Sequence, residues 1–182
     1  ARLRRLDRSC RRPLLTMHSL IYILVETASK ADAISEAEDI LTDLCGGNLA
    51  RYGPYDSYTL FQGNHRDELV ARWRGTIPPA APIDSDTGKE MVEDGWRQHK
   101  QSFHRDLDTV AAAIDDHSRD ELMASDSIRT AFQRLGARRG PPVTLYDQFA
   151  DGIRSRGQLD IHLDELTDGD RTGWVVPADV HH

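Results

Sequence analysis

One histidine of this chain has the surroundings in which an imidazole can act as a base. His99 falls between Trp96 and Phe103 in a run of residues spaced as on one face of a helix. Burial at such a position disfavours the charged ring, lowers its pKa and leaves a neutral imidazole suited to general-base work. Buried histidines more often have a structural role, with their polar atoms hydrogen-bonded in the core. We expect that structural role and keep Trp96 and His99 as candidate ligand-binding residues.

Two neighbouring arginines form the second candidate site. Arg138 and Arg139 directly precede the stop signal Gly140-Pro-Pro in an otherwise acidic chain. Guanidinium groups suit phosphate or carboxylate, so an anion-binding turn is one interpretation. The other is that the arginines stabilise a helix C-terminus and pair with the abundant aspartates. We favour the second interpretation and keep both arginines as candidate ligand-binding residues.

Other polar clusters lack the residues of the sites that they resemble. The segment Asp84–Lys89 has neither the first glycine and the final Ser or Thr of a phosphate loop nor the glycine and glutamate of a calcium loop. Asp160, His162 and Asp164 are two residues apart, which puts them on different sides of a helix. The sequence therefore predicts no metal and no cofactor. No nucleophile-elbow or dinucleotide motif is present, so no catalytic residue is assigned.

The charge is divided unevenly along the chain. Residues 1–16 contain six arginines and one aspartate, whereas the whole chain carries −7, so residues 17–182 carry −12. Aspartate (22) far exceeds glutamate (8), and three lysines stand against 20 arginines. Hydrated carboxylates with few lysines suit a protein surface in salty water. We interpret residues 1–16 as a basic extension, disordered or not native, and the rest as an acidic, halophilic body.

The composition also limits partners and location. A body of −12 argues against nucleic-acid binding, which needs basic surface. No apolar run reaches the ~18 residues of a membrane span, and His18 and Ser19 interrupt the run that would make residues 1–25 an export signal. Cys10 and Cys45 show neither metal spacing nor a disulfide framework. We predict a cytoplasmic protein with an unknown protein partner or self-association, and no nucleic-acid or membrane partner.

Strand and helix signals alternate along the body. The continuous apolar run Ser19–Val25 predicts a central strand buried on both faces, and Ser29 caps a helix to about Cys45. Tyr52–Gln62 and Glu68–Arg74 flank a Gly-Asn turn and predict a hairpin. Shorter signals predict a strand over 143–146, a helix over 156–166 and a last strand over 174–176.

The clearest periodicity predicts one long helix. Behind a capping box, Thr87-x-x-Glu90, mostly apolar residues recur at steps of three and four from Val92 to Ile114. We expect this stripe to pack on the sheet, with Phe103 mid-stripe in the core, so Phe103→Ala should cost about 3–5 kcal/mol. A second helical segment, capped by Ser118 and broken near residues 125–127, should run to about residue 135.

The order of these elements predicts the fold class. Its first half matches the start of a β-α-β-β-α-β sheet. We predict one α+β domain over residues 17–182. It should have two layers and a mainly antiparallel sheet of ferredoxin-like type, with extra C-terminal helices and strands.

Four segments are distinctive as strings of letters. They are Met17-His-Ser-Leu-Ile-Tyr, Pro79-Ala-Ala-Pro-Ile-Asp-Ser-Asp86, Tyr146-Asp-Gln-Phe-Ala-Asp-Gly-Ile-Arg154 and Trp174-Val-Val-Pro-Ala-Asp-Val-His181. With them, the chain from Met17 to His182 resembles an uncharacterised family of small proteins from halophilic archaea. The resemblance implies a halophilic, cytoplasmic protein. It implies no activity, so no catalytic residue follows from it.

Two functions from different classes remain. In the first, the protein is a small soluble, non-enzymatic binding or regulatory module, which the absence of catalytic motifs favours. In the second, it is a small-molecule or anion-binding enzyme with a pocket near Trp96, His99 and Arg139. A pocket lined by convergent polar groups would separate the two.

Overall fold

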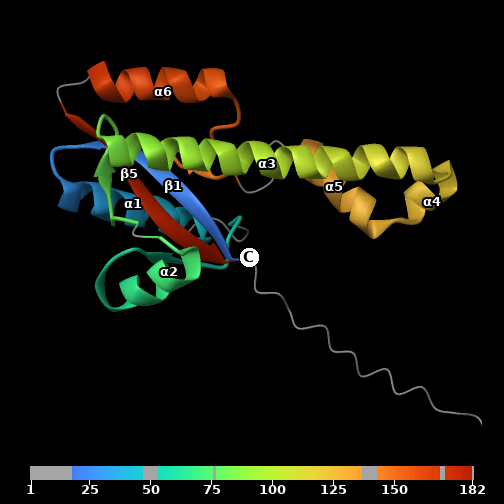
Figure 1. Cartoon of the computed structure of the whole chain (residues 1–182), viewed down its shortest axis with the longest axis horizontal. Helices are drawn as coiled ribbons and strands as arrows, with labels where there is room; N and C mark the ends of the chain where they lie inside the picture. The colour runs from blue at the N-terminus through green and yellow to red at the C-terminus, as the bar shows by residue number, and fades with distance from the viewer. Residues whose placement is uncertain (1–17, 47–52, 76, 137–142, 169–170, 182) are drawn as a thin grey trace, which may run out of the picture.

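The computed structural model describes residues 18–46, 53–75, 77–136, 143–168 and 171–181. Residues 1–16, interpreted above as an extension, lie outside these ranges. The described residues form an α+β structure (Figure 1). Its elements in chain order are β1 (His18–Thr27), α1 (Lys30–Leu44), β2 (Ser57–Leu60), a short 3-10 turn (Gly63–His65), α2 (Arg66–Trp73), β3 (Ala81–Pro82), α3 (Asp86–Asp116), α4 (Arg119–Ala124), α5 (Asp126–Gly136), β4 (Leu145–Tyr146), α6 (Arg156–Asp168) and β5 (Thr172–His181).

The sheet is built around the last strand. β5 pairs antiparallel with β1 over the full length of both strands, and it also pairs antiparallel with β2 and β3. β4 joins the other edge of β1 in parallel orientation, which gives the order β2-β5-β1-β4. The sheet is therefore mixed, and the expected mainly antiparallel, ferredoxin-like arrangement is not confirmed.

Helices cover both faces of this sheet, so the fold has three layers where two were expected. Ile21, Ile23 and Val25 of β1 pack on the side of α1. The alternate residues of β1 are Leu20, Tyr22 and Leu24, and they pack with side chains of α2, α3 and α6 on the other side (Figure 1). Because alternate side chains of a strand point to opposite faces, a strand covered on both sides needs a continuous apolar run. The prediction of a central, doubly buried β1 is confirmed.

The predicted hairpin is wrong in its second half, because residues 66–73 form the helix α2. Asp67 and Glu68 lie in the first turn of α2, where carboxylates suit the helix dipole. Leu69 and Trp73, four residues apart, pack together against the sheet. The apolar spacing of four, rather than the two of a strand, decided the local structure.

The long helix α3 is confirmed, but only its first half packs on the sheet. Ser85, rather than Thr87, caps it by accepting a hydrogen bond from the backbone N–H of Gly88 at 3.0 Å. Val92 is buried, whereas Phe103 is 40% exposed, so its expected place in the core is wrong. Its second half runs outward from the sheet with α4 and α5 (Figure 1). We call residues 103–136 the arm.

The remaining predictions of helix starts and breaks agree with the described elements. Ser29 caps α1, the capping box at Ser118 and Glu121 begins α4, and Ser125 separates α4 from α5. No helix among the described residues has both the length and the apolar character needed to cross a membrane.

Candidate functional site

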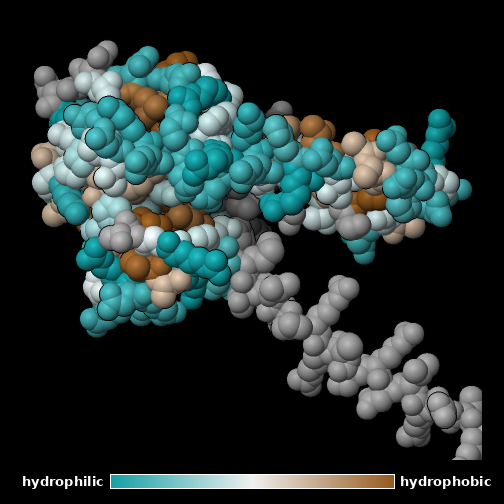
Figure 2. All heavy atoms as spheres, viewed as in Figure 1, coloured by the Kyte–Doolittle hydropathy of each residue, from teal (hydrophilic) through white to brown (hydrophobic). Residues whose placement is uncertain are grey.

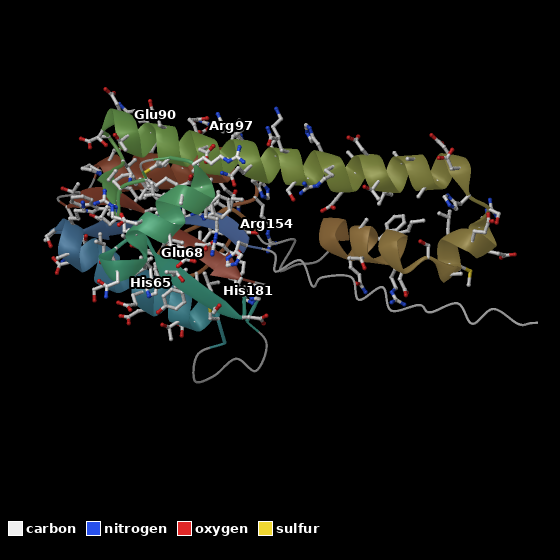
Figure 3. The ribbon with its side chains drawn as sticks, turned by 60° about the horizontal axis from the view of Figure 1, so that its bottom comes forward. His65, Glu68, Glu90, Arg97, Arg154 and His181 are labelled. Carbon is white, nitrogen blue, oxygen red and sulfur yellow. The ribbon has the colours of Figure 1, made fainter. Side chains whose placement is uncertain are left out.

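Trp96 and His99 lie side by side on α3, with ring centroids 5.6 Å apart. His99 is 8% exposed and hydrogen-bonds the backbone of Arg154, in a segment that passes beside α3 (Figure 3). Burial lowers the pKa of His99, and the nearby Arg154 charge lowers it further, while the backbone hydrogen bond opposes both. This environment is that of a hydrogen-bonded core histidine, held neutral at pH 7.

The other predicted site residues are not brought to His99 by the described structure. Arg138 and Arg139 lie outside the described residues. Asp160 pairs with Arg156, at 2.8 Å, rather than with His162. Among the described residues, no cluster of histidine, cysteine and acidic side chains could hold a metal ion.

The arm carries apolar side chains that its own helices leave uncovered. α5 packs against the second half of α3, and Val110 and Ile128 are buried between them. Beside this contact four large apolar residues remain 40–54% exposed, and Figure 2 shows hydrophobic surface on the arm, away from the sheet. We call these four residues the apolar face: Phe103, Leu107, Ile114 and Phe132.

These four residues lie on one side of the arm. Viewed along the axis of α3, the directions of Phe103, Leu107 and Ile114 are rotated away from that of the buried Val110. All three are rotated in the sense in which the helix itself turns. In α5, Phe132 is displaced from the buried Ile128 in the same rotational sense. Equal rotation in two antiparallel helices leads to the same side of the pair. The arm is therefore a two-helix layer with one apolar side covered by nothing in the described structure.

A row of charged and polar residues borders the apolar face along α3. Lys100, His104, Asp108 and Asp115 are exposed, and their spacings of four, four and seven place them on one side of the helix. The sign of the charge changes along the row, from Lys100 near the sheet to Asp115 near the tip. No described residue forms an ion pair with Lys100, Asp108 or Asp115.

A second group of polar side chains lies where β1 and β5 meet α2. Asp179 is only 2% exposed, and its Oδ2 accepts a hydrogen bond from Arg72 and lies 3.1 Å from Nδ1 of His18. Arg72 also pairs with Glu68 at 3.0 Å, and the ring of His181 packs on that of His18, with centroids 5.3 Å apart. Figure 3 shows Glu68 on α2 and His181 on β5, the elements that supply these groups.

Sequence reasoning missed this second group because its members are far apart in the chain. Asp179 follows five apolar or proline positions in β5, and an aspartate within a strand buried on both faces was the available signal. Buried carboxylates are rare unless paired, so a buried Asp179 needs cationic partners. The sequence does not identify which residues these partners are.

The fold and these three groups of residues define a small α+β protein with a projecting helical arm. The chain belongs to the family described as Domain of unknown function DUF7995, which matches residues 17–182. No curated protein and no solved structure matches the chain.

Proposed function

We propose that this protein is a non-enzymatic binding module that assembles with a second copy of itself through the apolar face of its arm. The observation that carries the proposal is the uncovered apolar side of the two-helix layer (Figure 2). Large contiguous apolar surface is costly in water and is typical of interaction sites.

A second copy suits this face in shape. A two-helix layer buries its apolar side when another two-helix layer packs on it, which makes a four-helix bundle. An identical arm offers a layer of the same length and apolar spacing, and a two-fold axis lets the same residues face each other. The bulky sheet domains then lie at opposite ends of the bundle if the arms run antiparallel.

The charges beside the face favour that antiparallel arrangement. In an antiparallel pair the Lys100 end of one arm lies beside the Asp115 end of the other, so opposite charges meet. A parallel pair would place Asp115 beside Asp115 and Lys100 beside Lys100. Charge complementarity at the rim of an interface sets orientation more than it sets affinity.

The first experiment measures the molar mass of the full chain by sedimentation equilibrium from low to high micromolar concentration. We expect a monomer–dimer equilibrium in the wild type. Leu107→Glu buries a charge in the proposed interface and should weaken association by about a hundredfold. Ile161→Glu is the matched control, because Ile161 is an exposed apolar residue of α6, away from the arm, at 59% exposure. A wild type that stays monomeric, or a control that dissociates equally, would contradict the proposal.

The second experiment tests the antiparallel orientation by exchanging charges. Asp115→Lys should weaken the dimer by about fivefold, the size of a partly exposed ion pair. Adding Lys100→Asp in the same chain reverses both ends of the row and should restore the affinity. If the double variant associates more weakly than either single variant, the arms do not pair in this way.

We further propose that the chain works in the cytoplasm of a halophilic archaeon. The support is the net charge of −12 on residues 17–182, the excess of aspartate and the scarcity of lysine. Self-repulsion of such a body is screened by added cations. The unfolding midpoint should therefore rise from low to molar KCl, and a flat or falling trend would contradict salt adaptation.

A further inference from the structure

A groove of about 270 Å³ opens at the root of the arm, between α3, the start of β1 and the end of α2. One face of α3 lines it with Gln98, Gln101, Ser102 and Arg105, whose spacings of three, one and three keep them together. These residues lie on the other side of α3 from Phe103, so the groove is separate from the apolar face. At about 30 Å³ per water molecule, this volume equals that of about nine waters, which suits a small molecule rather than a polymer.

The polar lining of the groove is free of acidic residues, although the chain has 30 of them. Among the lining residues, Arg105 carries a positive charge and His18 adds an imidazole. The side chain of Gln101 makes no hydrogen bond with another described residue. The hydroxyl of Ser102 accepts from Arg105 at 3.3 Å, which leaves its own O–H to donate. The groove thus presents donors and positive charge in an acidic protein.

The polar group at β1 and β5 holds His18 in place at the edge of this groove. Nδ1 of His18 lies 3.1 Å from the buried Oδ2 of Asp179 and 2.9 Å from Nη1 of Arg72. Nε2 is on the opposite edge of the ring and has no hydrogen-bond partner among the described residues. A guanidinium can only donate, so Nδ1 accepts from Arg72, and the ring proton is then on Nε2. A ring oriented in this way can donate its Nε2–H to a ligand.

Trp73 lines the groove from the end of α2, where its ring offers an apolar wall. Its indole N–H is buried and has no partner in the described structure, so it is shielded from a ligand in the groove.

We propose that the groove binds a small anion through phosphate or carboxylate oxygens, held by Arg105, His18 and the neutral donors of α3. Anionic oxygens accept hydrogen bonds only, so they match a lining that supplies arginine, imidazole, amide and hydroxyl donors. The same lining disfavours a cation, because it offers no carboxylate. This site is independent of the proposed self-association.

The experiment compares the melting temperature of the full chain in phosphate, in citrate and in chloride at equal ionic strength. We expect phosphate or citrate to raise the melting temperature by about 3–6 °C at ten times its Kd. Arg105→Gln and His18→Gln should reduce that rise to within about 1 °C, while Arg105→Lys should keep part of it. Arg129→Gln is the matched control, because Arg129 lies on α5, is 67% exposed and pairs with Asp126.

The outcomes separate the two sources of anionic oxygen. A rise with phosphate alone identifies a phosphate-bearing ligand, and a rise with citrate alone identifies a carboxylate. The proposal is overturned if neither anion stabilises the wild type beyond chloride. It is also overturned if Arg105→Gln responds as strongly as Arg129→Gln, since the effect would then be one of general charge.

Discussion

The two halves of α3 carry the same sequence pattern and have opposite surroundings. From residue 86 to about residue 102 the helix lies on the sheet, where Val92 is buried among side chains of β1, β4 and α6 and His99 is also buried. From Phe103 to Asp116 the helix projects from the sheet, and this half packs against α5 (Figure 1). Periodicity thus predicted an amphipathic helix along its length, but not which partner would cover each part of its apolar side.

The difference also separates two uses of apolar residues. In the first half they stabilise the fold, since Met91 and Val92 complete a core shared by three helices and the sheet. In the second half, large apolar side chains remain exposed to water in the described structure, so they do not stabilise the fold by burial. Such residues are retained where another surface covers them, which is why we assign the second half to association.

The largest expected effect distinguishes the buried half of α3 from the arm. Met91→Ala removes a buried side chain from the core and should lower the free energy of unfolding by about 2–5 kcal/mol. Leu107→Ala, in the arm, should cost less than about 1 kcal/mol in dilute, monomeric protein. Urea denaturation of both variants at low micromolar concentration measures the difference. Equal losses would show that the arm belongs to the same core.

The second prediction tests how closely α3 approaches the sheet. A Cβ on Gly95 would lie 2.8 Å from Cδ2 of Tyr22 and 3.1 Å from Cδ2 of Leu145. Gly95→Ala should therefore lower stability by about 1–2 kcal/mol, because strain from overpacking exceeds the gain in helix propensity. Gly157→Ala is the control, since a Cβ there meets no atom within 4 Å, and it should gain up to about 1 kcal/mol. A stabilising Gly95→Ala would argue against this packing.

Phe103 marks the boundary between the two halves and sharpens the comparison. As a core residue, Phe103→Ala would cost about 3–5 kcal/mol. With the side chain half-exposed, we now expect a loss of about 1 kcal/mol in the monomer and a clear loss of dimer affinity. Thermal unfolding and sedimentation of the same variant give both numbers. A loss of unfolding free energy above about 3 kcal/mol in the monomer would show that Phe103 is a core residue.

The smallest effect concerns pH and the buried His99. Its pKa is lowered in the folded state, so below about pH 6.5 the unfolded chain binds a proton that the folded chain resists. Stability should fall as pH drops through this window, by at most about 1.4 kcal/mol per pH unit from this residue. His99→Gln should flatten the decline between pH 7.5 and 5.5. The exposed His104→Gln is the control, and a curve unchanged by His99→Gln would contradict the assignment.

Much of the local structure could be predicted from single segments. Ser29 and Ser118 signalled helix starts, and the continuous apolar run of β1 signalled a strand buried on both sides, because these features depend on neighbouring residues alone. The segment Glu68–Arg74 was misassigned because its β-branched and aromatic residues fit a strand as well as a helix. Leu69 and Trp73 pack against Phe61 and the sheet. This packing shows that their helical spacing of four decided the local structure over the strand preference of the segment.

The candidate site could be predicted only in part. Trp96 and His99 were found because they share one helix, where spacing fixes proximity. Asp179, Arg72 and His18 meet across more than a hundred residues of chain, and no pattern in the sequence joins them. The partners of a buried charge depend on which strands pair and in which register, and that choice is made by the whole sheet.

The sequence by itself determined the acidic charge, the starts of α1 and α4 at Ser29 and Ser118, the doubly buried first strand and the long stripe of α3. Each follows from composition or from residues within a few turns of one another. Tertiary structure alone decided that β5 lies between β1 and β2, that α3 outruns the sheet, and that a donor-lined groove opens where it departs. Contacts far apart in the chain depend on the balance of burial over the whole domain, because a helix longer than the sheet beneath it must expose whatever side chains remain.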